Sequence, residues 1–162
     1  MLPLDAPVPE IACESKETWD VWEFNSEDEI FSKEAERFGL TAGPPISPVH
    51  GWDITNAKHQ QALVNMLGTH KPKFVVMASS TRPWCNSVAR RDPEVRAWLS
   101  EREQKHIPLI KEIIRIQLAN KGEVLFEMPL GTWLLDLPEM ADVKERCYGG
   151  RSSSHRFFVN LV

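Results

Sequence analysis

Apolar positions along the chain form short runs separated by longer amphipathic stretches. The runs, which are rich in β-branched and aromatic residues, predict strands at 19–24, 73–78, 124–126 and 155–162. Helices are expected between the first three runs, at about 27–38, 56–67 and 93–120. Strands that alternate with helices are typical of an α/β domain with a mostly parallel sheet and helices on both faces.

Residues that start and stop helices sharpen these boundaries. Ser26 and Glu29 have capping-box spacing, which predicts that Ser26 is the N-cap of the first helix. Gly39 and Gly68 are expected to end the first and second helices, because glycine adopts the left-handed conformation found after a helix. Pro108 must kink the long third helix or divide it in two. The proline-rich segment 41–50 between the first two helices is expected to be a loop or an irregular sheet edge.

Two strand ends are the expected place for a ligand. The apolar run 73–78 continues into a polar loop broken by Pro83, and the run 124–126 ends at Glu127, shortly before Pro129. In open α/β sheets, ligands bind where parallel strands end and loops begin. We therefore expect the site where these two strands meet the loops that follow them.

Length and composition fit one domain. At 162 residues we expect a single α/β domain over 18–162. Residues 1–17 are expected to form an extended or disordered lead-in, since three prolines fall in the first ten positions. The start of the chain lacks signal-peptide features, and no apolar run approaches the roughly 18 residues of a membrane span. An intracellular, cytoplasmic or nuclear protein without membrane attachment is the expectation.

Charge restricts the possible partners. A net charge of −4 argues against a protein that grips nucleic acid over its whole surface. Arg82, Arg90 and Arg91 nevertheless form a local basic loop that could touch nucleic acid or protein. The three cysteines include no C-x-x-C pair, and the histidines lack metal-ligand spacing, so no metal site is predicted.

Several enzyme classes lack their signatures. No Gly-x-Gly-x-x-Gly follows the first strand and no Walker A pattern exists, which argues against NAD binding and P-loop chemistry. Ser80 is not in a Gly-x-Ser-x-Gly elbow. Cys85 lies near Arg82, which could lower the pKa of its thiol, but the sequence places no base beside it. A hydrolase that uses either residue is therefore the last-ranked option.

The segment Phe74-Val-Val-Met-Ala-Ser-Ser-Thr-Arg-Pro-Trp-Cys85 resembles the Ser-Pro-Pro-Cys-Thr-Pro-Trp-Ser strand and loop of DNA (cytosine-5) methyltransferases. It is more closely similar to the methyltransferase-like domain in retrotransposon polyproteins of unicellular algae. Five further segments resemble that domain in order and spacing: Gly51-Trp-Asp-Ile54, Gln117-Leu-Ala-Asn-Lys-Gly122 (one residue longer here), Glu127-Met-Pro129, Cys147-Tyr-Gly149 and the closing Phe157-Phe-Val159. The resemblance runs from about residue 21 to 162 and implies a Rossmann-like methyltransferase fold.

The resemblance implies S-adenosylmethionine as cofactor and assigns residues to it. Glu23 and Phe24 would close the first strand where the methionine moiety lies. Asp53 would lie near the adenine, with Ile54 packed beside it. On its own, the position of Asp53 before a helix is equally well explained by a structural cap.

The resemblance also implies a substrate side. Arg82, Pro83 and Trp84 would form the loop over the target base, which must leave its stack to be methylated. Glu127 would contact the edge of the cytosine ring, although a strand-end carboxylate can equally be structural. Thr81 occupies the position of the catalytic cysteine, and a threonine hydroxyl is a far weaker nucleophile than a thiolate.

Two functional classes stay open from the sequence. One is a degenerate S-adenosylmethionine-dependent methyltransferase-like domain of mobile-element origin that acts on or binds nucleic acid. The other is a non-catalytic relic or binding module that keeps the fold without the cofactor.

Overall fold

A computed structural model describes most of the chain. The described residues are 7–10, 18–26, 28–78, 84, 93–128, 132–145, 147–148 and 156–159. The lead-in expected over 1–17 is thus described only at 7–10. No helix in these described ranges is long and apolar enough to cross a membrane.

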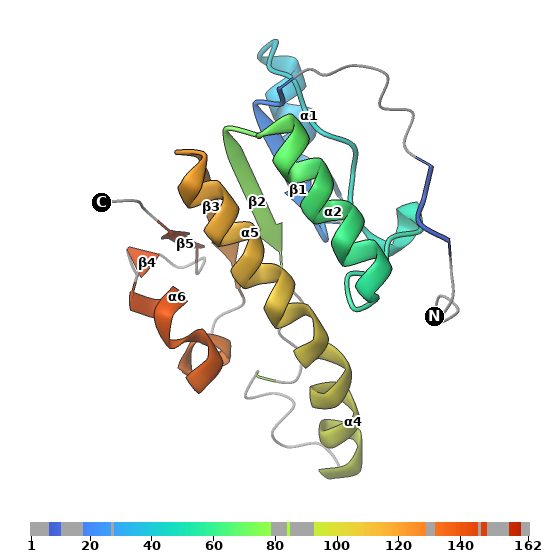
Figure 1. Cartoon of the computed structure of the whole chain (residues 1–162), viewed down its shortest axis with the longest axis vertical. Helices are drawn as coiled ribbons and strands as arrows, with labels where there is room; N and C mark the ends of the chain where they lie inside the picture. The colour runs from blue at the N-terminus through green and yellow to red at the C-terminus, as the bar shows by residue number, and fades with distance from the viewer. Residues whose placement is uncertain are drawn as a thin grey trace.

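A five-stranded sheet in the order β1-β2-β3-β5-β4 forms the centre of the molecule (Figure 1). The first three strands in this order are parallel: β1 (Val21–Phe24), β2 (Phe74–Ala78) and β3 (Glu123–Glu127). β5 (Arg156–Val159) pairs antiparallel with β3, and β4 (Cys147–Tyr148) pairs antiparallel with β5. The structure is therefore a mixed α/β domain with a parallel centre. The sequence pattern did not indicate the short strand β4.

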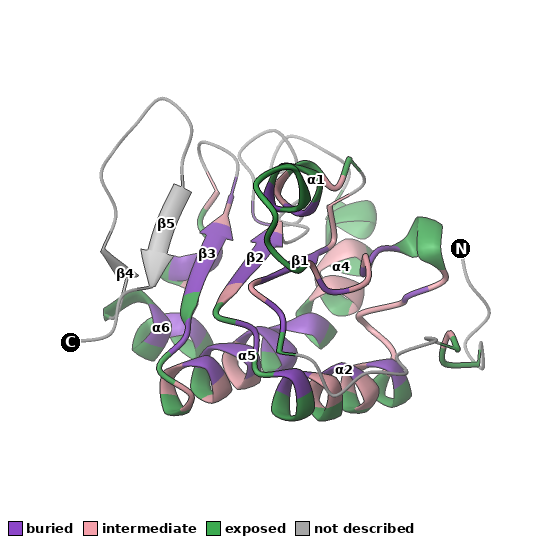
Figure 2. Ribbon diagram, turned by 90° about the horizontal axis from the view of Figure 1, so that it is seen from above, coloured by how far each residue is buried: buried purple, intermediate pink, exposed green. Residues whose placement is uncertain are grey.

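Helices lie on both faces of the sheet (Figure 2). Helix α1 (Ile30–Arg37) covers one face, and α2 (Ala57–His70) and α5 (Ile107–Ala119) pack side by side on the other. Helix α4 (Pro93–Glu103) precedes α5 and has no buried residue. The short elements are η1 (Pro48–His50), η3 (Gln104–His106), η4 (Leu134–Asp136), η5 (Pro138–Met140) and α6 (Ala141–Glu145).

Strand alternation divides the core between the two faces. Val21, Val76 and Leu125 form a small cluster with Ala35 of α1. The residues between them in the strands join the larger cluster with α2 and α5: Trp22, Phe24, Val75, Met77, Val124 and Phe126. Because both faces are covered, the strands appear in the sequence as continuous apolar runs.

The first helix begins later than its capping signal predicts. Helix α1 starts at Ile30, and Glu29 before it has a positive φ of 52° with no side-chain capping bond. The Glu29 carboxylate lies 3.1 Å from His50 Nε2 instead. The prediction of a capping box from Ser26 and Glu29 is therefore wrong, because the Glu29 side chain contacts His50 in the 41–50 segment instead.

The second helix does not stop at glycine. Helix α2 continues through Gly68 to His70, and Lys71 takes the left-handed position with φ 43°. Both Leu67 and His70 are buried, so the last turn is stabilised by packing despite the glycine. The predictions for Gly39 and Pro108 are confirmed: Gly39 has φ 75° after α1, and η3 divides α4 from α5 just before Pro108.

The 41–50 segment is an irregular sheet edge, as expected. Isolated parallel bridges join Ala42 to Val21 and Ile46 to Phe24. Between these bridges, Trp22 Nε1 donates a 2.9 Å hydrogen bond to the Pro44 carbonyl. The segment thus covers the outer edge of β1 without forming a regular strand.

A buried glutamine clamps the start of the parallel strands. Gln117 of α5 is fully buried, and its Nε2 donates to the Pro72 carbonyl at 3.0 Å and to the Glu123 carbonyl at 3.3 Å. These carbonyls precede β2 and begin β3, so one side chain holds both strand starts against α5. Gly122 lies against the same amide, where a larger residue would not fit.

Gly122→Ala should destabilise the protein by about 1–3 kcal/mol. The added Cβ would lie 2.7 Å from Gln117 Nε2 and 3.1 Å from the Pro72 carbonyl oxygen. Gly68→Ala is the matched control, because its Cβ meets nothing within 4 Å inside α2. It should stabilise by about 0.5–1 kcal/mol. Urea unfolding measures both, and equal effects at the two sites would contradict the clamp.

Asp20 ties the beginning of β1 to two other segments. Its Oδ2 accepts hydrogen bonds from Thr41 N and Oγ1, both at 2.9 Å. Its Oδ1 accepts a 2.6 Å bond from Lys73 Nζ. The Lys73 bond, followed by the Thr41 bonds, lowers the pKa of Asp20 to about 2.

Stability should therefore depend on the ionisation of Asp20 in acid. An aspartate in an unfolded chain has a pKa of about 3.9, so the stabilisation is complete above that pH. It is lost as the pH falls from about 4 to about 2. The difference in melting temperature between wild type and Asp20→Asn should be largest at neutral pH and vanish near pH 2. Melting curves that stay equally separated at every pH would contradict this role.

Candidate functional site

The parallel register brings the expected strand ends together. Ala78, the last residue of β2, lies opposite Glu127, the last residue of β3. Phe24 at the end of β1 lies opposite Met77. Beyond β1, Asn25 Nδ2 donates a 2.8 Å hydrogen bond to the Ala78 carbonyl, which joins the first two strand ends.

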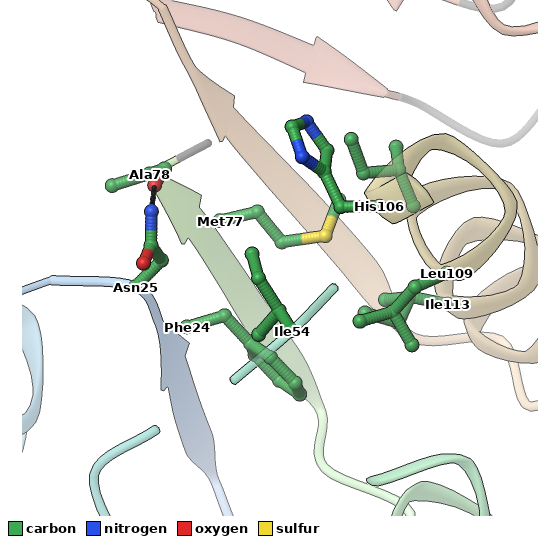
Figure 3. Close-up of a pocket in the computed structure, with 9 residues that line it drawn as sticks. Phe24, Asn25, Ile54, Met77, Ala78, His106, Leu109 and Ile113 are labelled. Carbon is green, nitrogen blue, oxygen red and sulfur yellow. Dashed lines mark hydrogen bonds between the residues drawn. The ribbon is translucent and has the colours of Figure 1, made fainter. Parts of the chain in front are cut away.

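An apolar pocket lies beside these strand ends, on the face covered by α5 (Figure 3). Phe24, Ile54 and Met77 point from the sheet side toward Leu109 and Ile113 of α5. The remaining lining residues are Asn25, Ala78, His106 and Ile110. The pocket has a volume of about 20 Å³, which is enough for one water molecule.

Two of the residues assigned to the cofactor meet in this pocket. Phe24 is buried at the end of β1, and Ile54 is half-buried in the loop before α2. The 41–50 segment brings them together, because its bridge to Phe24 carries the chain along β1 before it turns into α2. Both side chains therefore line the same apolar wall.

Glu23 lies away from this pocket. Strand alternation turns it to the α1 face, where it is 3% exposed. Its Oε2 accepts hydrogen bonds from Ser32 N at 3.0 Å and from Ser32 Oγ at 2.9 Å. The carboxylate thus joins β1 to the first turn of α1, which is a structural use of the group.

Asp53 is held by the turn that leads into α2. Its Oδ1 accepts hydrogen bonds from Thr55 N at 2.9 Å and Thr55 Oγ1 at 2.7 Å. Its backbone N donates to His59 Nδ1 at 3.0 Å. Asp53 therefore fits the structural alternative for its position, while Ile54 beside it still reaches the pocket.

Of the residues assigned to the substrate side, the structure describes only Glu127 and Trp84. Glu127 is half-buried, and alternation gives it the same face as Leu125, opposite to the pocket. Thr81, Arg82 and Pro83 lie outside the described residues, as do Ser80, Cys85, Arg90 and Arg91. The described geometry therefore contains neither the residue at the cysteine position nor the basic loop.

Trp84 is part of the core. It is 1% exposed, and its ring meets the His106 ring edge-on, with centroids 5.7 Å apart and planes at 87°. Its carbonyl accepts a 2.9 Å hydrogen bond from Trp133 N. The resemblance placed Trp84 in a loop over a base, whereas its indole is packed inward beside the pocket.

His106 is the pocket residue that the sequence did not reveal. It ends η3, is fully buried, and has its Nδ1 3.4 Å from Glu103 Oε2. The helix break before Pro108 was visible in the sequence and marks this position. Which side chain of the polar run 104–106 turns inward depends on tertiary packing, which the run itself does not specify.

Among the described residues, no group of three or more His, Cys, Asp or Glu side chains could hold a metal ion. No protein-family model, no curated protein and no solved structure matches the chain. The candidate site therefore depends on the geometry of this chain and on the sequence resemblance.

Asp53→Ala should lower the free energy of unfolding by about 1 kcal/mol, because it removes two hydrogen bonds to a carboxylate. Asp53→Asn keeps an oxygen that can accept both bonds and should stay within about 0.5 kcal/mol of wild type. Urea unfolding of the two variants measures the difference. An Asp53→Ala variant as stable as wild type would mean that the turn does not hold the carboxylate.

Proposed function

We propose that the chain is a degenerate methyltransferase-like domain of mobile-element origin, with a residual cofactor cleft at the carboxyl ends of β1 and β2. The meeting of Phe24 and Ile54 supports this proposal most. The sequence resemblance assigns these two residues to the same ligand, and they line one pocket. The pocket also adjoins strand ends, where open α/β sheets bind ligands.

The fit to S-adenosylmethionine is incomplete. A volume of about 20 Å³ is far below that of a nucleoside, so the pocket as it stands takes at most a small apolar group. The carboxylates of Glu23 and Asp53 accept hydrogen bonds within the chain. We therefore assign no catalytic step to the described residues, and Thr81 argues separately against thiolate attack on cytosine.

Nucleic acid is the proposed partner of the domain, whether the domain is catalytic or not. The proposal depends on the sequence of the basic segment with Arg82, Arg90 and Arg91 within a chain of net charge −4. Contacts between such cations and phosphates weaken steeply as salt rises. A retained interaction would therefore be strongly salt-dependent.

A non-catalytic binding module is the second candidate, and the packing of Trp84 favours it. The resemblance assigns Trp84 to a loop over a base, and a fully buried indole is not available for that contact. Such a domain would keep the fold and lose the cofactor. The two candidates differ in whether the cleft binds S-adenosylmethionine at all.

Calorimetric titration with S-adenosylmethionine and S-adenosylhomocysteine separates them. We expect weak binding, with a dissociation constant on the order of 0.1–1 mM, because the cleft offers mainly apolar contacts. Ile54→Ala should weaken it by about fivefold to tenfold, from the loss of roughly 1 kcal/mol of apolar contact.

Ile116→Ala is the matched control for this titration. Like Ile54, Ile116 is partly buried and packs against the main core, but it does not line the pocket. Its truncation should leave the dissociation constant unchanged. Absence of binding at millimolar ligand would reject the residual cleft and leave the non-catalytic module.

A further inference from the structure

We propose that His106 selects the ligands of the carboxyl-edge pocket by filling the space that a planar ring would otherwise occupy. The proposal deepens the proposed function and depends on it for the use of the pocket as a ligand site. It assigns a specific role to a residue that neither the sequence pattern nor the resemblance singled out.

The position of His106 places a ring at the carboxyl end of the sheet. Figure 3 shows His106 on the helix side of the pocket, with the Met77 side chain between it and Ile54; Ala78, at the tip of β2, lines the same pocket. The other residues around the pocket are apolar apart from Asn25, whose amide is bonded to the Ala78 carbonyl. The imidazole is therefore the one aromatic heterocycle among the residues that line this space.

Two side chains lie next to the ring. Glu103 Oε2 lies 3.4 Å from Nδ1, at the C-terminal end of α4. Trp84 presents its ring edge-on at 5.7 Å between centroids and is itself nearly fully buried. The backbone of the preceding residue is also held, since the Lys105 carbonyl accepts a 2.6 Å hydrogen bond from Gln60 Nε2. The ring is thus packed from several sides.

The size of the pocket explains why the ring matters. With His106 present, the free volume is about 20 Å³, which is the space of about one water molecule. Truncation to alanine would join the space of a five-membered ring to this volume. Apolar walls of Ile110, Met77 and Phe24 would then surround a cavity with the shape of a small planar heterocycle. A purine enters only if the ring leaves.

The segment that carries the ring has a construction that permits movement. Helix α4 has no buried residue, so little apolar burial holds it to the body. A 3₁₀ turn between two α-helices is a common hinge geometry. In η3 this turn carries His106 directly before α5, whose inner face is anchored in the core. Displacement of η3 would withdraw the ring from the pocket, at the cost of its contact with Trp84 and of the hydrogen bond from Gln60 to the Lys105 carbonyl.

The test is the binding of imidazole to His106→Ala, observed through the methyl NMR signals of Met77 and Ile110 and through the melting temperature. His59→Ala is the matched control. His59 is also fully buried and lies edge-on to a tryptophan, Trp52, at 5.7 Å and 83°, but it does not line the pocket. Imidazole should shift both methyl signals and raise the melting temperature only in His106→Ala.

S-adenosylhomocysteine supplies the second readout. Its affinity should rise by about tenfold in His106→Ala relative to wild type, because the adenine no longer has to displace the ring. If His106→Ala binds imidazole but not S-adenosylhomocysteine, the proposed role of His106 is supported and the proposed cofactor cleft is rejected. If S-adenosylhomocysteine binds wild type and His106→Ala with equal affinity and shifts the Met77 methyl signal in both, the cofactor cleft is supported. The proposed role of His106 is then overturned.

A folded His106→Ala that gives no methyl shift with imidazole also overturns the proposal. If His106→Ala does not fold, His106→Val retains more of the packing and xenon replaces imidazole as the probe, since apolar cavities take up xenon. Xenon shifts at Met77 and Ile110 in His106→Val, absent in wild type, would support the proposal. Their absence would overturn it.

Discussion

Alternation along three parallel strands decides which side chains of this molecule can share a site. Neighbouring residues of a strand point to opposite faces, and helices cover both faces here. Glu23 therefore bonds Ser32 of α1, while Phe24 beside it lines the pocket under α5. Within the strands, the α5 face takes Phe24 and Met77 but not Glu23, and Asn25 and Ala78 join the pocket only where the strands end, which limits its polar groups.

The sequence predicted the parts of the fold that depend on local pattern. Continuous apolar runs located the three parallel strands, and Pro108 predicted the break between α4 and α5. The meeting of two strand ends also follows from such runs, because parallel strands end at one edge. The predictions that were wrong concern features set by distant contacts: the Glu29 carboxylate lies against His50, and α2 extends past Gly68 because His70 packs in the core.

The sequence predicted some residues of the pocket and missed others for the same reason. Ile54 was expected there, whereas the inward position of His106, beside Trp84 and Glu103, depends on packing that its own segment does not specify.

Three buried histidines each pack against a tryptophan. His70 is stacked on Trp19 with ring centroids 3.9 Å apart, whereas His59 is edge-on to Trp52 and His106 is edge-on to Trp84. A tryptophan offers a large apolar area together with an electron-rich face that suits an imidazole edge. Four of the six tryptophans, Trp19, Trp22, Trp52 and Trp84, are core residues, whereas Trp98 and Trp133 are exposed.

Polar groups at the carboxyl edge are largely used within the chain, and this limits how a ligand can bind there. The amide of Asn25 holds Ala78, and the carboxylate of Asp53 holds Thr55. A ligand that took over either group would leave its present partner unsatisfied, at a cost of about 1–3 kcal/mol. Apolar contact with Phe24, Met77 and Ile110 carries no such cost, so it supplies the net gain. Binding in this cleft should therefore depend on whether a flat apolar group can replace the His106 ring more than on hydrogen bonds to the strand ends.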